Sequence, residues 1–153
     1  MIEITRRFTA SPKQVFAAWT DAAQLARWFA PKGCRIEYRK LDVRPGGRFH
    51  SVIHDPQHGP CWTIGTYTQV VPGQKIVFSM ALADERGVPV TDSTEAGKIP
   101  EWPPETTVTI LFEKDGTGTK LTLQQTVNEA LARKTGAYPG WISMLERLDE
   151  LLA

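Results

Sequence analysis

The feature that most constrains the fold is a change of period along the chain. Between residues 34 and 127, six segments alternate apolar and polar side chains, which is typical of strands buried on one face. A seventh such segment lies at residues 2–8, and one long amphipathic helix follows the strands near the C-terminus. Because a sheet cannot leave its apolar face in water, we expect that face to fold around the C-terminal helix.

Turn residues separate the six segments. We predict strands at residues 34–43, 48–54, 61–71, 74–82, 106–114 and 119–127. The connections at 44–47, 72–73 and 115–118 carry glycine beside proline or aspartate, which is the composition of tight turns. Residues 55–60 contain two prolines and a glycine, and we predict a six-residue loop there.

Two short helices are predicted after the first strand. Ser11, Pro12 and Gln14 form the pattern of a capping box with proline at the first helical position, and Asp21 with Gln24 repeats the capping pattern. Residues 31–33, Pro-Lys-Gly, end the second helix. The apolar residues that the two helices are expected to bury are Val15, Phe16, Trp19, Leu25, Trp28 and Phe29.

The C-terminal helix has a broad apolar face. Its apolar stripe contains Trp141, Met144, Leu145, Leu148, Leu151 and Leu152. The opposite side contains Glu146, Arg147, Asp149 and Glu150, and we expect its acids to be solvated. Pro139 lies near the start of this helix, so residues 129–135 are predicted to form a separate turn or a kinked approach.

Composition and charge exclude several classes of function. The chain of 153 residues is 41% hydrophobic and 23% charged, with a net charge of +1 and no basic run, so we expect neither nucleic-acid binding nor a membrane anchor. No stretch reaches the roughly eighteen apolar residues of a membrane span, and the N-terminus lacks a signal-peptide core. Two cysteines make no disulfide framework. We therefore expect one cytoplasmic domain, residues 1–153, with reduced thiols.

All three histidines lie in one short segment whose spacing resembles a metal site. His50, His54 and His58 are four residues apart, and Cys61 follows. On a helix they would share a face, but glycines before the segment and prolines after it favour a hairpin. On a strand four residues span about 13 Å, which two ligands of one zinc ion cannot bridge. Only His54 and Cys61 could meet, across the hairpin, so we predict no metal ion here.

The sequence contains no recognisable catalytic motif. It has no nucleophile elbow, nucleotide-binding glycine loop or HExxH pattern. Acid–base chemistry in an apolar interior would need one of the few polar residues that could face inward, which are Tyr38, Tyr67, His50, His54 and Gln125. The strand pattern favours an inward Phe49, which turns His50 outward. We predict no catalytic residue and no cofactor.

Several blocks of the sequence together resemble one superfamily. The blocks are EITRRFTASPKQVFAAWTDAAQLARWF, LDVRPGGRF, GTYTQVVPGQKIVFS, EWPPETTVTILF and PGWISMLERLDELL. From about residue 2 to residue 152 the chain resembles the START-like superfamily, and within it the C-terminal domain of the activator of heat-shock-protein-90 ATPase. The resemblance implies an α+β helix-grip fold, with two short helices after the first strand and a curved seven-stranded antiparallel sheet around the C-terminal helix.

The resemblance also implies a ligand cavity. Members of this superfamily usually enclose an apolar cavity between the sheet and the C-terminal helix, in which they bind lipids, sterols, polyketides or plant hormones. We therefore expect a binding protein for a small hydrophobic or amphipathic molecule. The candidate ligand-binding residues are Tyr38, Phe49, Trp62, Ile64, Phe78, Met80, Trp102, Val108, Ile110, Leu123, Trp141, Met144, Leu145 and Leu148. Side chains of these types fill a solid core as readily as they line a pocket.

Two other functions stay open, and one loop has two interpretations. The resemblance admits a partnership with a chaperone ATPase, although the activator's contacts involve a second domain that we do not find here, and it admits a cavity enzyme of the polyketide cyclase or dehydratase type. Residues 83–105 form a long polar loop in which Trp102 lies among prolines. This loop is either a lid with Trp102 folded inward or a surface loop pinned by one buried tryptophan.

Overall fold

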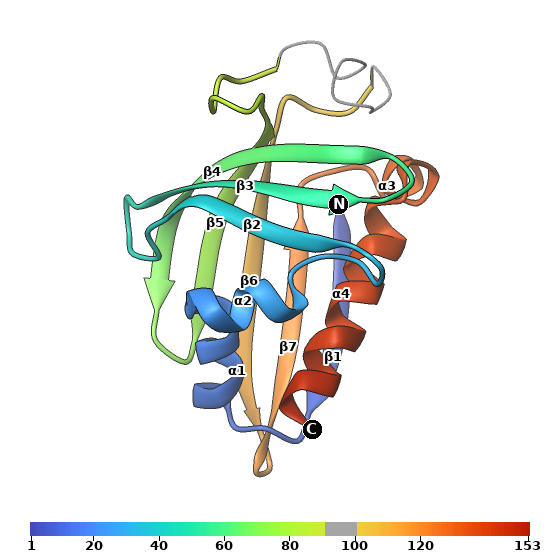
Figure 1. Ribbon diagram of the computed structural model, residues 1–153. Helices are drawn as coiled ribbons and strands as arrows, with labels where there is room; N and C mark the ends of the chain where they lie inside the picture. Colours follow the sequence, from blue (N-terminus) through green and yellow to red (C-terminus); the bar gives the residue numbers. More distant parts are fainter. Residues whose placement is uncertain (91–100) are drawn as a thin grey trace.

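One antiparallel sheet of seven strands, with helices packed against one of its faces, makes up the fold (Figure 1). The structure is a computed structural model that describes residues 1–90 and 101–153. The strands lie in the order β1-β7-β6-β5-β4-β3-β2. Their bounds are β1 Ile2–Phe8, β2 Arg35–Leu41, β3 Arg48–Asp55, β4 Gly59–Val71, β5 Lys75–Leu82, β6 Glu105–Asp115 and β7 Gly118–Gln125. The helices of the described residues are α1 Pro12–Thr20, α2 Ala22–Trp28, α3 Glu129–Thr135 and α4 Ala137–Leu152.

The helices occupy the curve of the sheet. Helix α1 contacts β6 and β7, α2 contacts β2, and α4 contacts β1 and both short helices. Figure 1 shows α4 running along the sheet to the C-terminus, with the β6–β7 turn at one end of the sheet and the segment around residue 102 at the other. The predicted helix-grip arrangement is confirmed.

The two short helices begin where the capping residues predict. The Gln14 backbone N–H donates to Ser11 Oγ at 3.3 Å, and the Ser11 N–H donates to Gln14 Oε1 at 3.0 Å. Asp21 Oδ2 accepts from the Gln24 backbone N–H at 3.1 Å. The predicted core residues of these helices are buried, except that Phe16 and Phe29 are only half-buried. Local capping therefore sets both helix starts.

The approach to the C-terminal helix differs from the prediction. Residues 129–135 form the helix α3, in which the Asn128 side chain accepts from the Leu131 backbone N–H at 3.0 Å. Gly136, with φ 87°, ends it in the left-handed region, and α4 begins immediately after. The predicted turn or kinked approach is wrong, because an asparagine cap and a glycine stop give these residues a helix of their own. No helix in the described ranges is long and apolar enough to cross a membrane.

The hairpin of β3 and β4 is tighter than predicted. β3 extends to Asp55 and β4 begins at Gly59, so residues 56–58 make the connection in place of the predicted six-residue loop. In the observed register Ile53 pairs with Cys61, and His54 pairs with Pro60. The meeting of His54 with Cys61 that a hairpin could have allowed does not occur, since the register differs by one residue, and this difference decides the faces of β4.

Arg147 ties α4 to the end of α2. Its Nη2 donates to the Arg27 carbonyl at 2.9 Å, and its Nη1 donates to the carbonyls of Ala30 at 2.6 Å and Cys34 at 3.3 Å. Nearby, Lys32 Nζ lies 2.9 Å from Glu146 Oε2. Arg147 lies on the predicted polar side of α4 and is half-buried there, because it donates to the last carbonyls of α2 and to those of the loop after it.

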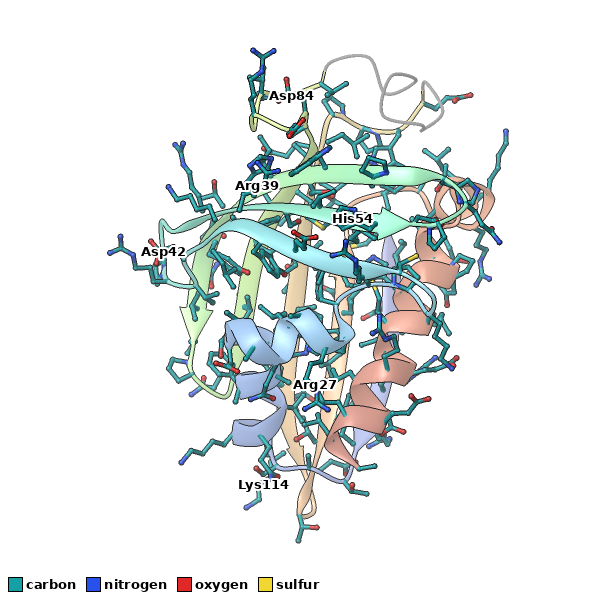
Figure 2. All side chains as sticks on the ribbon, in the orientation of Figure 1. Arg27, Arg39, Asp42, His54, Asp84 and Lys114 are labelled. Carbon is teal, nitrogen blue, oxygen red and sulfur yellow. The ribbon has the colours of Figure 1, made fainter. Side chains whose placement is uncertain are left out.

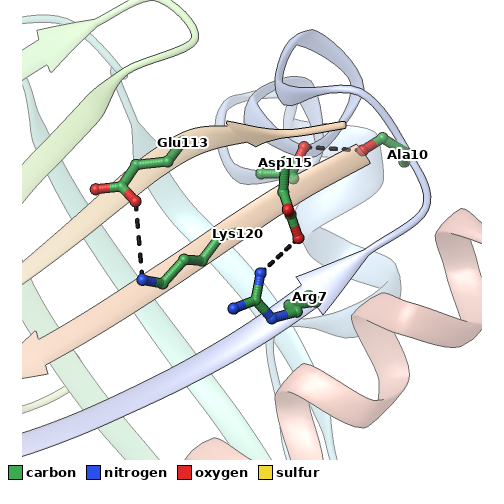
Figure 3. Close-up of polar contacts among 6 residues, drawn as sticks. Arg7, Ala10, Glu113, Asp115 and Lys120 are labelled. Atoms are coloured by element: carbon green, nitrogen blue, oxygen red, sulfur yellow. Dashed lines mark hydrogen bonds and ion pairs between the residues drawn. The ribbon is translucent and has the colours of Figure 1, made fainter. Parts of the chain in front are cut away.

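Polar contacts fix the end of the sheet at the β6–β7 turn (Figure 3). Asp115 Oδ2 lies 2.5 Å from Arg7 Nη1, which joins β6 to the edge strand β1. The buried Thr119 hydroxyl donates to the Ala10 carbonyl at 2.8 Å. These contacts hold β1 and the chain that follows it against the hairpin.

Gly140→Ala is expected to stabilise the protein by about 0.5–1 kcal/mol, since alanine is the better helix former inside α4. A Cβ there would meet nothing closer than Pro31 Cγ at 3.7 Å, which is ordinary contact. Thermal or urea unfolding measures the change. The matched control is Gly136→Ala, which should destabilise because Gly136 has φ 87°. A Gly140→Ala protein no more stable than the wild type would contradict the assignment of free space.

Candidate functional site

An apolar cavity of about 180 Å³ lies between the sheet and the first half of α4. It is lined by residues of β3 to β7, of the loop after α2, of α4 and of the segment before β6. The large apolar side chains in its wall include Phe29, Ile53, Met80, Trp102, Trp141 and Met144. Among the described residues no Asp, Glu, Lys, Arg or His lines the cavity, so its wall is uncharged.

A hydrogen-bonded row of neutral side chains crosses the wall of the cavity. Gln125, only 3% exposed, accepts through Oε1 from Trp141 Nε1 at 2.9 Å and donates through Nε2 to Thr106 Oγ1 at 3.1 Å. The amide orientation follows from these two partners. The hydrogen bonds of Gln125 are therefore made to neutral partners, and this polar part of the wall suits a neutral molecule.

The structure divides most of the predicted site residues between this cavity and a solid core. Met80, Trp102, Trp141 and Met144 line the cavity. The predicted site residues that are at most 1% exposed and fill the core are Val108, Ile110, Leu123, Leu145 and Leu148. Tyr38, Phe49 and Phe78 line a much smaller void of about 10 Å³. The interior is therefore hollow at one end and packed at the other.

Trp62 and Ile64 lie on the opposite face of the sheet from the cavity, so their predicted inward positions are wrong. The Trp62 ring centre is 5.1 Å from that of His50 and 4.9 Å from the guanidinium of Arg39, which is labelled in Figure 2. Ile64 lines an outer groove together with His50. Phe49 is buried and pairs with Gly65, so β4 points its odd-numbered residues inward from Cys61 to Tyr67, where its register shifts.

Sequence reasoning therefore missed the cavity residues on β4. Cys61 and Thr63 line the cavity from the positions that Trp62 and Ile64 were predicted to hold. A three-residue turn at 56–58 would have identified them, because a shift of pairing by one residue moves a whole strand face. Phe29 was predicted as a core residue only, although it also forms part of the cavity wall.

The histidines separate along the hairpin. His50 Nε2 donates to the Asp84 carbonyl at 3.1 Å, and His54 Nε2, on β3 as labelled in Figure 2, lies 2.9 Å from Glu37 Oε1. His58 Nδ1 lies 2.9 Å from Asp55 Oδ2 in the turn. The described ranges contain no group of three or more His, Cys, Asp or Glu side chains that could hold a metal ion. The interpretation of this segment as a hairpin is confirmed.

Three groups with the chemistry of a nucleophile or an acid, Cys34, Tyr38 and Tyr67, have raised pKa values. Burial, and then the nearby Asp55 carboxylate, raise the pKa of the Cys34 thiol, which keeps it protonated. Burial raises the pKa of both Tyr38 and Tyr67 well above the usual range, so both hydroxyls stay neutral. These shifts run away from the values that general acid–base work at neutral pH requires.

Only part of the long loop that could act as a lid over the cavity lies among the described residues. Of its predicted range, 83–105, residues 91–100 lie outside the described residues, so the lid interpretation stays a prediction. Before them, Asp84 Oδ1 accepts from the backbone N–H groups of Arg86 and Val88 and forms a turn. After them, Trp102 is half-buried, lines the cavity and packs against the core.

A curved antiparallel sheet that grips a long C-terminal helix around an interior cavity defines a START-like, helix-grip protein. The chain belongs to the family described as Activator of Hsp90 ATPase homolog 1-like protein, whose model matches residues 9–153. The resemblance read from the sequence blocks is confirmed at the level of this family. Comparison with curated proteins finds no match.

Solved structures from several bacteria share the fold. A protein from Mycobacterium smegmatis is 25% identical with a TM-score of 0.81, over 99% of this chain and 89% of that one. A protein from Chromobacterium violaceum is 24% identical with a TM-score of 0.80, over 99% and 95% of the two chains. The AHSA1 protein from Silicibacter pomeroyi is 23% identical with a TM-score of 0.77, over 99% and 96%. The last two likenesses concern the fold alone.

Proposed function

We propose that this protein binds a small, uncharged, predominantly apolar molecule in the cavity between the sheet and α4. The observation that carries the proposal is the cavity itself, about 180 Å³ of space whose wall has no charged side chain among the described residues. Membership of a family with a ligand-binding type of fold supports it. We propose the cytoplasm as its compartment, since Cys34 and Cys61 are both free thiols.

The size of the cavity limits the ligand. Pockets for drug-sized molecules measure roughly 300–1,000 Å³, and an engineered cavity of about 150 Å³ takes up benzene. A cavity of about 180 Å³ therefore fits a compound of one or two rings, or a short chain. A sterol or a two-chain lipid would need a larger interior.

The lining of the cavity limits the chemistry of the ligand. A buried carboxylate or ammonium costs several kcal/mol unless it finds an opposite charge, and this wall supplies none among the described residues. Trp102 and Trp141 present aromatic surface, and Met80 and Met144 adapt to irregular shapes. We therefore propose a neutral aromatic or aliphatic ligand.

Met80→Trp is expected to lower the affinity for a neutral aromatic probe such as indole by at least about tenfold, because the larger ring occupies the cavity. Isothermal calorimetry on wild type and variant measures it, with thermal unfolding to show that the variant is folded. The control is Trp62→Phe, on the outer face of the sheet, which should bind the probe as the wild type does. Equal affinity in wild type and Met80→Trp would contradict the cavity as the binding site.

Partnership with a chaperone ATPase is the second candidate, and an outer groove favours it. Among the described residues, the groove, about 380 Å³, is lined by the cations Arg39, Lys40, Arg48 and Arg86 and by one acid, Glu105. Such a surface suits an acidic patch on a partner protein. The test is the ATPase rate of the heat-shock ATPase from the same organism, with wild type and with Arg48→Glu added. The cyclase or dehydratase alternative gains no acid–base group, because the pKa values of Tyr38 and Tyr67 are raised.

A further inference from the structure

A second, smaller void adjoins the cavity at Phe29. This inner void measures about 10 Å³ and is lined by Trp19, Tyr38 and Tyr67 together with apolar side chains of the core. Phe29 lines both spaces. Displacement of the Phe29 ring is therefore the route by which we expect the inner void to join the cavity.

Trp19 brings an unpaired donor to the inner void. It is 2% exposed, and its Nε1 has no hydrogen-bond acceptor among residues 1–90 and 101–153. The other two deeply buried tryptophans differ, since Trp28 Nε1 donates to the Ala18 carbonyl at 2.9 Å and Trp141 Nε1 donates to Gln125 Oε1 at 2.9 Å. A buried N–H is rarely left without an acceptor, because it has lost its hydration.

Two tyrosines add donors to the same place. Tyr38 and Tyr67 both line the inner void, and burial raises the pKa of both. Both therefore remain protonated at neutral pH, and a protonated hydroxyl can donate. One tryptophan and two tyrosines thus line a space of about 10 Å³, close to the volume that one water molecule needs.

We propose that the inner void is a polar subsite of the cavity, in which Trp19 Nε1 and the hydroxyls of Tyr38 and Tyr67 bind one acceptor oxygen of the ligand. This inference rests on the proposed function. It narrows the ligand to a neutral molecule with an apolar body and a carbonyl or hydroxyl oxygen at one end. The body occupies the cavity beside Met80 and Met144, and the oxygen passes Phe29.

Phe29 is placed to act as the gate of this subsite. It is the C-terminal cap residue of α2 and is half-buried. Its ring makes edge contacts with Trp28 at 5.1 Å and with Trp19 and Trp141 at 5.8 Å, measured between ring centres. No side-chain hydrogen bond holds a phenylalanine ring, so rotation exchanges one set of aromatic contacts for another.

A matched pair of probes tests the subsite. The ketone 2-acetylnaphthalene and the alkene 2-isopropenylnaphthalene differ only in an oxygen against a CH₂ group. Their affinities for the full chain are measured by NMR titration or calorimetry, in wild type and in Trp19→Phe, which removes the N–H and keeps a ring. We expect the ratio of ketone to alkene affinity to fall by about tenfold or more in Trp19→Phe, with the alkene affinity nearly unchanged.

Further measurements keep the outcome decisive. Tyr67→Phe replaces Trp19→Phe if that variant does not fold, and should lower the same ratio. The Phe29→Ala variant should bind the ketone with at least the affinity of the wild type and with a higher association rate constant. In the wild type, the Trp19 indole N–H resonance should move on addition of the ketone and not of the alkene, and the outer-face variant Trp62→Phe should match the wild type throughout.

The possible failures are distinguishable. If both probes bind and the ratio is the same in wild type, Trp19→Phe and Tyr67→Phe, the subsite is overturned and the cavity stands. The oxygen that satisfies Trp19 is then that of a buried water. If neither probe binds the wild type, the subsite is overturned together with the proposed binding of small neutral ligands.

Discussion

Gly65→Ala is expected to destabilise the protein by at least about 3 kcal/mol, which is a large part of the stability of most domains. A Cβ at this position would lie 2.0 Å from the Ser79 carbonyl oxygen and 2.3 Å from Phe49 Cε2. Gly65 pairs with Phe49 across β3 and β4, so the ring packs directly over the glycine. Because the first of these clashes is with backbone, a side-chain rotation cannot relieve it.

Urea unfolding of Gly65→Ala measures this loss. The matched control is Gly140→Ala, another glycine to alanine change at the edge of the interior, where the nearest atom is 3.7 Å away and a gain of stability is expected. If Gly65→Ala is less than about 1 kcal/mol below the wild type, the register of β3 and β4 derived above is wrong.

Arg147→Ala is expected to cost about 2–3 kcal/mol of unfolding free energy, because a charged donor leaves at least three backbone carbonyls at once. Those carbonyls belong to Arg27, at the end of α2, and to Ala30 and Cys34, in the loop that borders the cavity. Arg147→Lys should recover only part of the loss, since one ammonium cannot reproduce the spread of a guanidinium.

The control for Arg147 is Arg133→Ala, on α3. Arg133 Nε lies 3.3 Å from Glu129 Oε2, and its guanidinium lies 4.0 Å from the Tyr138 ring centre. The side chains of Arg133 and Glu129 are more than half exposed, so loss of Arg133 should cost at most about 1 kcal/mol. Chemical unfolding compares the two variants. Equal small losses would show that the connection between α2 and α4 does not depend on Arg147.

Most of the fold follows from signals that are local in the sequence. Ser11 and Asp21 are helix caps that bond to residues three places away, and their helices begin where predicted. The apolar stripe that includes Leu145 and Leu148 places α4 against the sheet. Helix α3 also has a local signal, the Asn128 cap and the Gly136 stop, although the nearby Pro139 favours a break in the helix.

The site was less predictable because it depends on register. A six-residue loop at 55–60 places Cys61 opposite His54, whereas the observed turn places it opposite Ile53. That single residue moves Trp62 and Ile64 from the cavity to the outer face and brings Cys61 and Thr63 inward. Side chains alternate between the two faces of a strand. A slip of one residue therefore leaves the predicted strand in place but reverses which of its residues face inward.

Other features of the site are tertiary and have no local signal. The unpaired Nε1 of Trp19 could not be predicted, because its neighbour Trp28 has the same residue type and similar burial but finds the Ala18 carbonyl. Nor does the sequence show that Phe29 separates two voids. Arg147 looks like any charged residue on the polar side of a helix until the loop after α2 is placed beside it.

Native mass spectrometry of the protein, purified gently from the organism that encodes it, tests whether the cavity holds a small neutral ligand. We predict a discrete added mass, that of a neutral compound of one or two rings or a short chain, which organic solvent releases and which is absent from Met80→Trp prepared in the same way. The cavity of about 180 Å³ sets that size. A bare chain mass across growth conditions, or an added mass equal in wild type and Met80→Trp, would contradict ligand binding in this cavity.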